Sequence, residues 1–120
     1  MTYKPFSHNL TTSETSTGRK LNDAVLYTKI VKVAGTIATG SSSAAHGITG
    51  LARLVTMRVS IERSNGQVLF IPLTHTGLSS TFHIGAFVDG TNINFQVGTG
   101  WTGAGNVLSD AWVVLEYTKT

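Results

Sequence analysis

The residues best suited to recognising a ligand lie in a glycine-rich segment, Gly98-Thr99-Gly100-Trp101-Thr102-Gly103, that continues to Asn106. A tryptophan held among glycines is not expected to be wholly buried, so its flat apolar face is predicted to stack on a sugar ring. Thr102 and Asn106 would supply the hydrogen bonds. Tryptophan is also enriched at protein interfaces, so packing of Trp101 in the core or on a neighbouring subunit is the alternative. We predict Trp101, Thr102 and Asn106 as ligand-binding residues.

The same segment matches the G-x-G-x-x-G pattern of dinucleotide-binding proteins. That pattern requires a helix whose N-terminus holds the pyrophosphate. Only residues 104–110 separate the loop from the next predicted strand, and a strand-helix-strand crossover needs about 10–12 residues or more. The sequence therefore predicts no nucleotide cofactor, and no other cofactor is indicated.

Catalytic candidates are limited to the serines at 41–43, which lie near His46, with Asp23 or Asp89 as a possible third partner. No nucleophile elbow surrounds these serines. The six acidic residues are far apart in sequence, so no carboxylate pair for glycoside hydrolysis is visible. We predict no catalytic residues and a protein that is not an enzyme.

Metal ligands are also scarce, because cysteine is absent and only four histidines occur, at positions 8, 46, 75 and 83. No two histidines are spaced i, i+2 on a strand, the spacing that places two side chains on one face. His75 and His83 flank a loop and are the pair that folding could bring together. We predict no metal site.

Charge and composition argue against a nucleic-acid partner and against insertion into a membrane. The chain has 12% charged residues, a net charge of +3 and no run of basic residues. Phe87 and Phe95 could stack on bases, but their alternation favours the core, so no nucleic-acid partner is predicted. No stretch approaches the roughly 18 apolar residues of a membrane helix. The first ten residues lack the apolar region of a signal peptide, so we expect synthesis in the cytoplasm and no membrane insertion.

Alternating apolar residues and turn signals predict an all-β protein. The two clearest turns are Asn65-Gly66 and Asp89-Gly90, which favour hairpins. Residues 35–50 and 98–106 are predicted loops. The polar residues 1–24 are predicted to form an extended arm for attachment, and residues 25–120 an antiparallel β-sandwich head. The predicted strands cover 25–33, 53–62, 67–73, 82–88, 92–97 and 111–117.

Several short motifs resemble the head domains of bacteriophage tail-fibre and baseplate-appendage proteins. The ending Ala111–Thr120 (AWVVLEYTKT) is similar to their last strand, and Ala45-His46-Gly47-Ile48 to their H-G-I element. Residues 89–94 (DGTNIN) match their penultimate strand and residues 27–29 (YTK) their first. The family often has a tryptophan before that first strand, where residues 18–23 have none and Leu21 takes its place. The resemblance covers roughly residues 18–120.

This resemblance implies a virion component, made in the host cytoplasm and displayed on the particle as a jelly-roll-like knob. It implies a homotrimer that binds a host-surface saccharide, with the arm contacting other virion proteins. The alternative is a capsid-decoration or tail-assembly structural protein without receptor binding.

Overall fold

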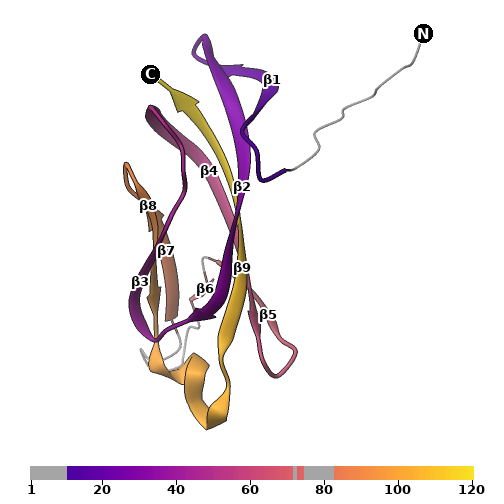
Figure 1. Cartoon of the computed structure of the whole chain (residues 1–120), viewed down its shortest axis with the longest axis vertical. Coiled ribbons are helices and arrows are strands. Elements are labelled where there is room, and N and C mark those ends of the chain that lie inside the picture. The colour runs from indigo at the N-terminus through magenta and orange to yellow at the C-terminus, as the bar shows by residue number, and fades with distance from the viewer. Residues whose placement is uncertain (1–10, 72, 75–82) are drawn as a thin grey trace, which may run out of the picture.

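Two antiparallel β-sheets packed face to face make up the fold (Figure 1). The computed structural model describes residues 11–71, 73–74 and 83–120. The five-stranded sheet has the order β1 (Thr15–Leu21), β2 (Ala24–Ile37), β9 (Leu108–Lys119), β4 (Leu51–Arg63) and β5 (Val68–Ile71). The four-stranded sheet has the order β3 (Gly40–Ala45), β8 (Asn92–Val97), β7 (His83–Val88) and β6 (Leu73–Thr74). The predicted all-β sandwich is confirmed.

Alternation of apolar and polar residues explains the clearest strands. In β8, Ile93 and Phe95 are buried, while Asn94 and Gln96 face outward. In β4, Val59 and Ile61 point into the core. Because successive side chains of a strand point to opposite faces, each of these sequences fits one orientation against the core. The turns at Asn65-Gly66 and Asp89-Gly90 join β4 to β5 and β7 to β8, as predicted.

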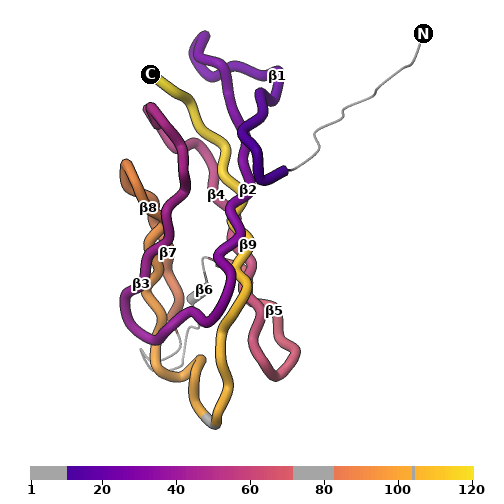
Figure 2. Tube along the Cα trace, viewed as in Figure 1, coloured from indigo at the N-terminus to yellow at the C-terminus, as the bar shows by residue number. Residues whose placement is uncertain are grey.

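The core lies between the sheets and is centred on β9. Ala111, Val113, Leu115 and Tyr117 alternate along this strand and are fully buried. Strand β9 pairs with β2 on one side and β4 on the other, so segments from opposite ends of the chain lie side by side (Figure 2). Each large apolar side chain removed from water contributes about 1.5–3 kcal/mol, which makes this cluster the main stabilising feature.

The predicted loop at residues 35–50 is partly wrong, because it contains the end of β2 and all of β3. Strand β3 is mostly serine and alanine, without the β-branched residues that mark strands in sequence. Its stability comes from pairing, since every residue from Gly40 to Ala45 has a partner in β8. Gly40 takes a positive φ of 90°, where the chain turns from one sheet to the other.

Part of the predicted arm also belongs to the sandwich. Residues 15–21 form β1, a hairpin partner of β2 at the edge of the five-stranded sheet. Asn22 and Asp23 join the two strands with φ values of 47° and 65°, the left-handed pair that a type I′ turn requires. Residues 1–10 of the arm, Pro72 and the range 75–82 lie outside the described residues.

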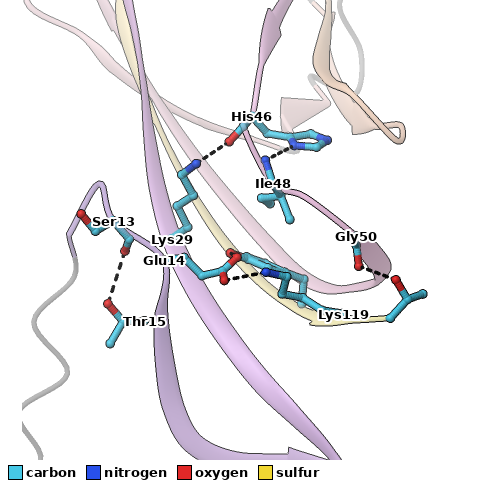
Figure 3. Close-up of polar contacts among 10 residues, drawn as sticks. Ser13, Glu14, Thr15, Lys29, His46, Ile48, Gly50 and Lys119 are labelled. Atoms are coloured by element: carbon cyan, nitrogen blue, oxygen red, sulfur yellow. Dashed lines mark hydrogen bonds and ion pairs between the residues drawn. The ribbon is translucent and has the colours of Figure 1, made fainter.

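Polar contacts attach the residues before β1 and the β3–β4 connection to the five-stranded sheet (Figure 3). Glu14 accepts hydrogen bonds from Lys119 Nζ at 2.8 Å and from the Tyr117 hydroxyl at 2.7 Å. Lys29 Nζ donates to the backbone oxygen of His46 at 2.7 Å. These bonds tie the residues before β1 to β9, and the β3–β4 connection to β2.

Candidate ligand-binding site

The glycine-rich segment forms a 3₁₀ helix, η2 (Thr99–Gly105), where a loop was predicted. This helix closes one end of the sandwich between β8 and β9 (Figure 1). Trp101 is only 5% exposed and belongs to the hydrophobic core. The guanidinium carbon of Arg63 lies 5.6 Å from the centre of the indole ring, and Arg63 Nε donates to the Trp101 backbone oxygen at 2.9 Å.

Thr102 and Asn106 are engaged in contacts that hold this turn together. The hydroxyls of Thr102 and Thr39 share a hydrogen bond of 2.6 Å. The Asn106 amide donates to the Gly103 oxygen at 3.0 Å, and its oxygen accepts from the Ser64 hydroxyl at 3.2 Å. The three predicted residues therefore lie close together in η2 and just after it. Their contacts stabilise this turn and the end of the core.

The expectation that Trp101 stays accessible is wrong. The compact turns of η2 place the indole over the open end of the core, where Arg63 covers it. Burial of the ring in the core removes more apolar surface from water than exposure among glycines would, and this decides its position. A sugar has no open face of Trp101 to stack on, so we place the candidate site elsewhere.

His46, the candidate general base, is buried and has both ring nitrogens engaged. Its Nδ1 accepts from the backbone N–H of Ile48 at 3.0 Å, and its Nε2 lies 2.9 Å from the backbone oxygen of Asp89. An acceptor at Nδ1 means that the proton is on Nε2, which donates to Asp89. His46 therefore links the β3–β4 connection to the β7–β8 turn, and its lone pair is not available to activate a serine.

Metal-binding geometry is likewise not formed by the described residues, among which no group of three or more His, Cys, Asp or Glu side chains comes together. His75 lies outside the described residues, so its pairing with His83 stays a prediction. Phe87 and Phe95, the candidates for base stacking, are on opposite faces of the four-stranded sheet: Phe95 is 1% exposed and Phe87 is 54% exposed.

Two aromatic side chains do lie open to solvent, on the outer face of the five-stranded sheet. Trp112 on β9 is 40% exposed and Phe70 on β5 is 70% exposed. Ser60 of β4 is paired with both residues, so the three side chains form one row across the sheet. Because neighbouring strands are about 4.8 Å apart, the two aromatic residues stand roughly 9–10 Å apart with a short serine between them.

The row borders an open hollow of about 270 Å³, which we call the Trp112 hollow. Trp112 and Phe70 border it on two sides, and Ser60 and Arg58 are the polar residues of its lining. A ring-shaped ligand contacting aromatic carbon at about 4 Å on both sides requires a gap of this width. Apolar walls with a few polar groups are the usual composition of a small-molecule site. The lining residues are Arg58, Val59, Ser60, Phe70, Trp112 and Val114.

Basic side chains flank the Trp112 hollow. Lys32 Nζ lies 5.0 Å from the centre of the Trp112 ring, which is a cation–π contact. The acidic neighbour Glu116 is occupied, since it accepts from Arg19 at 2.6 Å and from Thr56 at 2.8 Å. The residues that line the hollow are aromatic, aliphatic, hydroxyl-bearing and cationic.

Neither Trp112 nor Phe70 is among the ligand-binding residues predicted from the sequence. The alternation of side chains along β9 contains a signal that Trp112 faces solvent. Trp112 alternates with the buried residues Val113 and Leu115 and shares its parity with Glu116, whose charge marks the solvent face. An acidic residue four positions along from an aromatic indicates a shared exposed face, provided that the strand has no bulge between them.

The chain is thus an antiparallel β-sandwich with an aromatic hollow on one outer face. No helix among the described residues has the length and apolarity to span a membrane. No protein-family model, curated protein or solved structure matches the chain.

Proposed function

We propose that this protein is the head domain of a bacteriophage tail fibre or related virion appendage, and that it binds a host-surface saccharide in the Trp112 hollow. The observation that carries the proposal is the row Trp112–Ser60–Phe70, in which two exposed aromatic walls flank a hydroxyl. The apolar faces of a sugar ring stack on aromatic side chains, while its hydroxyls bond to Ser60 and Arg58. The virion part of the proposal is supported by the resemblance of the motifs at residues 45–48, 89–94 and 111–120 to the head domains of phage tail fibres.

The proposed assembly is a homotrimer, attached to the particle through its N-terminal residues. Three copies of a shallow hollow bind a cell surface far better than one copy does. A single site with a dissociation constant of about 1 mM gains a factor of about 10²–10⁴ when several sites engage together. Weak individual sites are therefore compatible with firm attachment of the particle.

The proposal is tested by binding of the purified protein to host cells and to immobilised surface glycans. Trp112→Ala and Phe70→Ala should each reduce binding at least tenfold, because each removes one wall. Trp112→Phe keeps an aromatic face and should retain most of the binding. Val107→Ala, which trims another exposed apolar side chain, should have no effect. Unchanged binding by folded Trp112→Ala would exclude the hollow as the receptor site.

A second candidate function is architectural: a capsid-decoration or tail-assembly protein without a receptor. The exposure of Trp112 and Phe70 favours it, because large exposed apolar side chains also suit burial against another virion protein. Deletion of residues 1–10 leaves β1 and the contacts of Glu14 in place and separates the two functions. Loss of particle incorporation with unchanged cell binding supports the fibre head. Absence of cell binding in both forms supports the architectural role.

A further inference from the structure

The described strands of the four-stranded sheet, β3, β6, β7 and β8, contain no acidic residue, lysine or arginine. Solvent-facing surfaces usually intersperse charges of both signs, at about 25–35% of residues. Among the described residues, the outer face of this sheet instead presents hydroxyls, amides, Phe87 and His83, with the Asp89 carboxylate in the β7–β8 turn beside it. Such a surface can form many hydrogen bonds without requiring an ionic partner.

The polar side chains form two adjacent rows. Gln96 of β8 lies opposite Ser41 of β3 and Gly85 of β7. Two residues earlier, Asn94 lies opposite Ser43 and Phe87. Because residues i and i+2 of a strand share a face about 7 Å apart, the two amides stand side by side along β8.

Hydrogen bonds within the sheet hold both amides in position. Gln96 Nε2 donates to the Ser41 hydroxyl at 2.7 Å, and Asn94 Nδ2 donates to the Asp89 carboxylate at 3.1 Å. An amide side chain offers two donors and an acceptor oxygen, so each keeps capacity for a ligand hydroxyl. Polar groups that are oriented before binding lose less conformational entropy when a ligand arrives.

A hollow of about 170 Å³ lies among these side chains, and we call it the Phe87 hollow. Phe87 is 54% exposed and gives it an aromatic wall. Gly85 leaves the face open beside Gln96, since a Cβ added at this position would meet no heavy atom within 4 Å. The hollow is lined by Ser41, Ser42, Ser43, Phe87, Asn94, Phe95 and Gln96.

The neighbouring carboxylate disfavours anionic ligands. Asp89 accepts backbone hydrogen bonds from Asn92 at 2.7 Å and Thr91 at 2.8 Å. These donors, followed by the Asn94 amide, hold the pKa of Asp89 below its ordinary value. Asp89 is therefore ionised at neutral pH beside Asn94, where it repels a negatively charged sugar.

We propose that the Phe87 hollow is a second binding site, for an uncharged saccharide, on the opposite face of the sandwich from the Trp112 hollow. Phe87 stacks on the sugar ring, and Asn94, Gln96 and Ser43 bond to its hydroxyls. Gly85 borders Gln96 on the β7 side and leaves the approach to that amide open. This proposal stands on the four-stranded sheet alone and does not require the Trp112 hollow to function.

The test is titration of the isotope-labelled full chain with neutral oligosaccharides of glucose, galactose and mannose, and with oligogalacturonate as the anionic comparison. Amide resonances report on weak binding. At least one neutral oligosaccharide should shift the resonances of β7 and β8, and oligogalacturonate should not. Gly85→Leu should weaken that binding at least tenfold by covering the approach to Gln96, and Phe87→Ala should do the same by removing the wall.

Two control variants separate the effect of side-chain size at position 85 from any contribution of the Trp112 hollow. Gly85→Ala adds only a methyl group and should bind more strongly than Gly85→Leu. Trp112→Ala should retain the neutral-sugar binding at β7 and β8, even if it loses binding to host cells. The proposal is overturned if no neutral oligosaccharide shifts these resonances, or if Gly85→Leu binds as the wild type does. A change in the number of protomers in folded Gly85→Leu would also overturn it, because this face would then be an interface between copies.

Discussion

Trp101 and Trp112 show how position within the sandwich determines what a tryptophan does. Trp101 lies in the core at the end of the sandwich, while Trp112 stands on the outer face. Mutation of the two residues is therefore expected to change different properties of the protein. Stability should report on Trp101, and ligand binding should report on Trp112.

Trp101→Ala is expected to destabilise the protein by about 3–5 kcal/mol, the usual effect of removing a large aromatic side chain from a core. A domain of this size has about 5–15 kcal/mol of stability, so the variant should be close to unfolding. Urea denaturation followed by circular dichroism measures the loss. Trp112→Ala is the matched control and should shift the midpoint little. A wild-type midpoint for Trp101→Ala would contradict its place in the core.

Ionisation of Glu14 makes the stability of the folded protein depend on pH. Burial acts to raise the pKa of Glu14, but hydrogen bonds from Lys119 and Tyr117, and the charges of Lys119 and Lys29, outweigh it. The net pKa lies below its ordinary value of 4.5. A carboxyl with a lowered folded pKa stabilises the fold above its unfolded pKa, and this contribution is lost as the pH falls through the folded pKa.

We expect Glu14→Gln to lower the free energy of unfolding at pH 7 by less than about 1 kcal/mol, since the pair with Lys119 is partly exposed to solvent. The difference from wild type should shrink as the pH falls below about 4.5. Denaturant titrations at pH 7, 5 and 3 measure it. A difference that stays constant over this range would show that ionised Glu14 is not the source.

At the scale of elements, pairing partners decide which segments become strands. Strand β3 lacks strand-forming residues and is held by β8, and β1 is held by β2. The β1–β2 turn is a weak point of this arrangement. Both of its residues, Asn22 and Asp23, adopt the left-handed conformation that glycine occupies most easily.

Asp23→Gly should therefore stabilise the hairpin by about 0.5 kcal/mol, because Asn-Gly is the preferred pair for a type I′ turn. The thermal midpoint should rise by about 2–3 °C in a domain of this length. Asp23→Ala should lower it, because alanine is strained at positive φ. Differential scanning calorimetry of the two variants provides the measurement. A rise for both variants would mean that removal of the carboxylate, and not the turn, controls stability.

At the scale of the whole molecule, the two outer faces differ in character. Charged residues are concentrated on the five-stranded sheet, and the described strands of the four-stranded sheet have none. The two proposed sites thus present different chemistry on opposite sides of one sandwich. A multivalent assembly would display several copies of each.

We expect light scattering of the purified protein to give a mass of three protomers of 12.7 kDa, about 38 kDa in total. Trimers raise the avidity of weak sites, and this is why the fibre-head proposal requires more than one copy. The mass should not change on dilution through the micromolar range. A monomer at micromolar concentration would count against the fibre head and favour a capsid-decoration role.

Much of the fold followed from the sequence. The alternation in Asn92–Val97 and Ala111–Tyr117, and the turns at Asn65-Gly66 and Asp89-Gly90, predicted strands and hairpins that the structure contains. These signals are local, because the alternation of side chains along a strand and the φ angles of a turn depend on adjacent residues. Local chemistry was therefore sufficient to predict an all-β sandwich.

Tertiary structure decided which aromatic side chains are accessible and which polar segments become strands. The burial of Trp101 depends on Arg63 and on the end of the core, which are distant in sequence. The Trp112 hollow needs β9, β4 and β5 to be neighbours, and the Phe87 hollow needs β3, β8 and β7. Juxtaposition is set by pairing between strands far apart in the chain, and no local pattern of residues encodes that pairing.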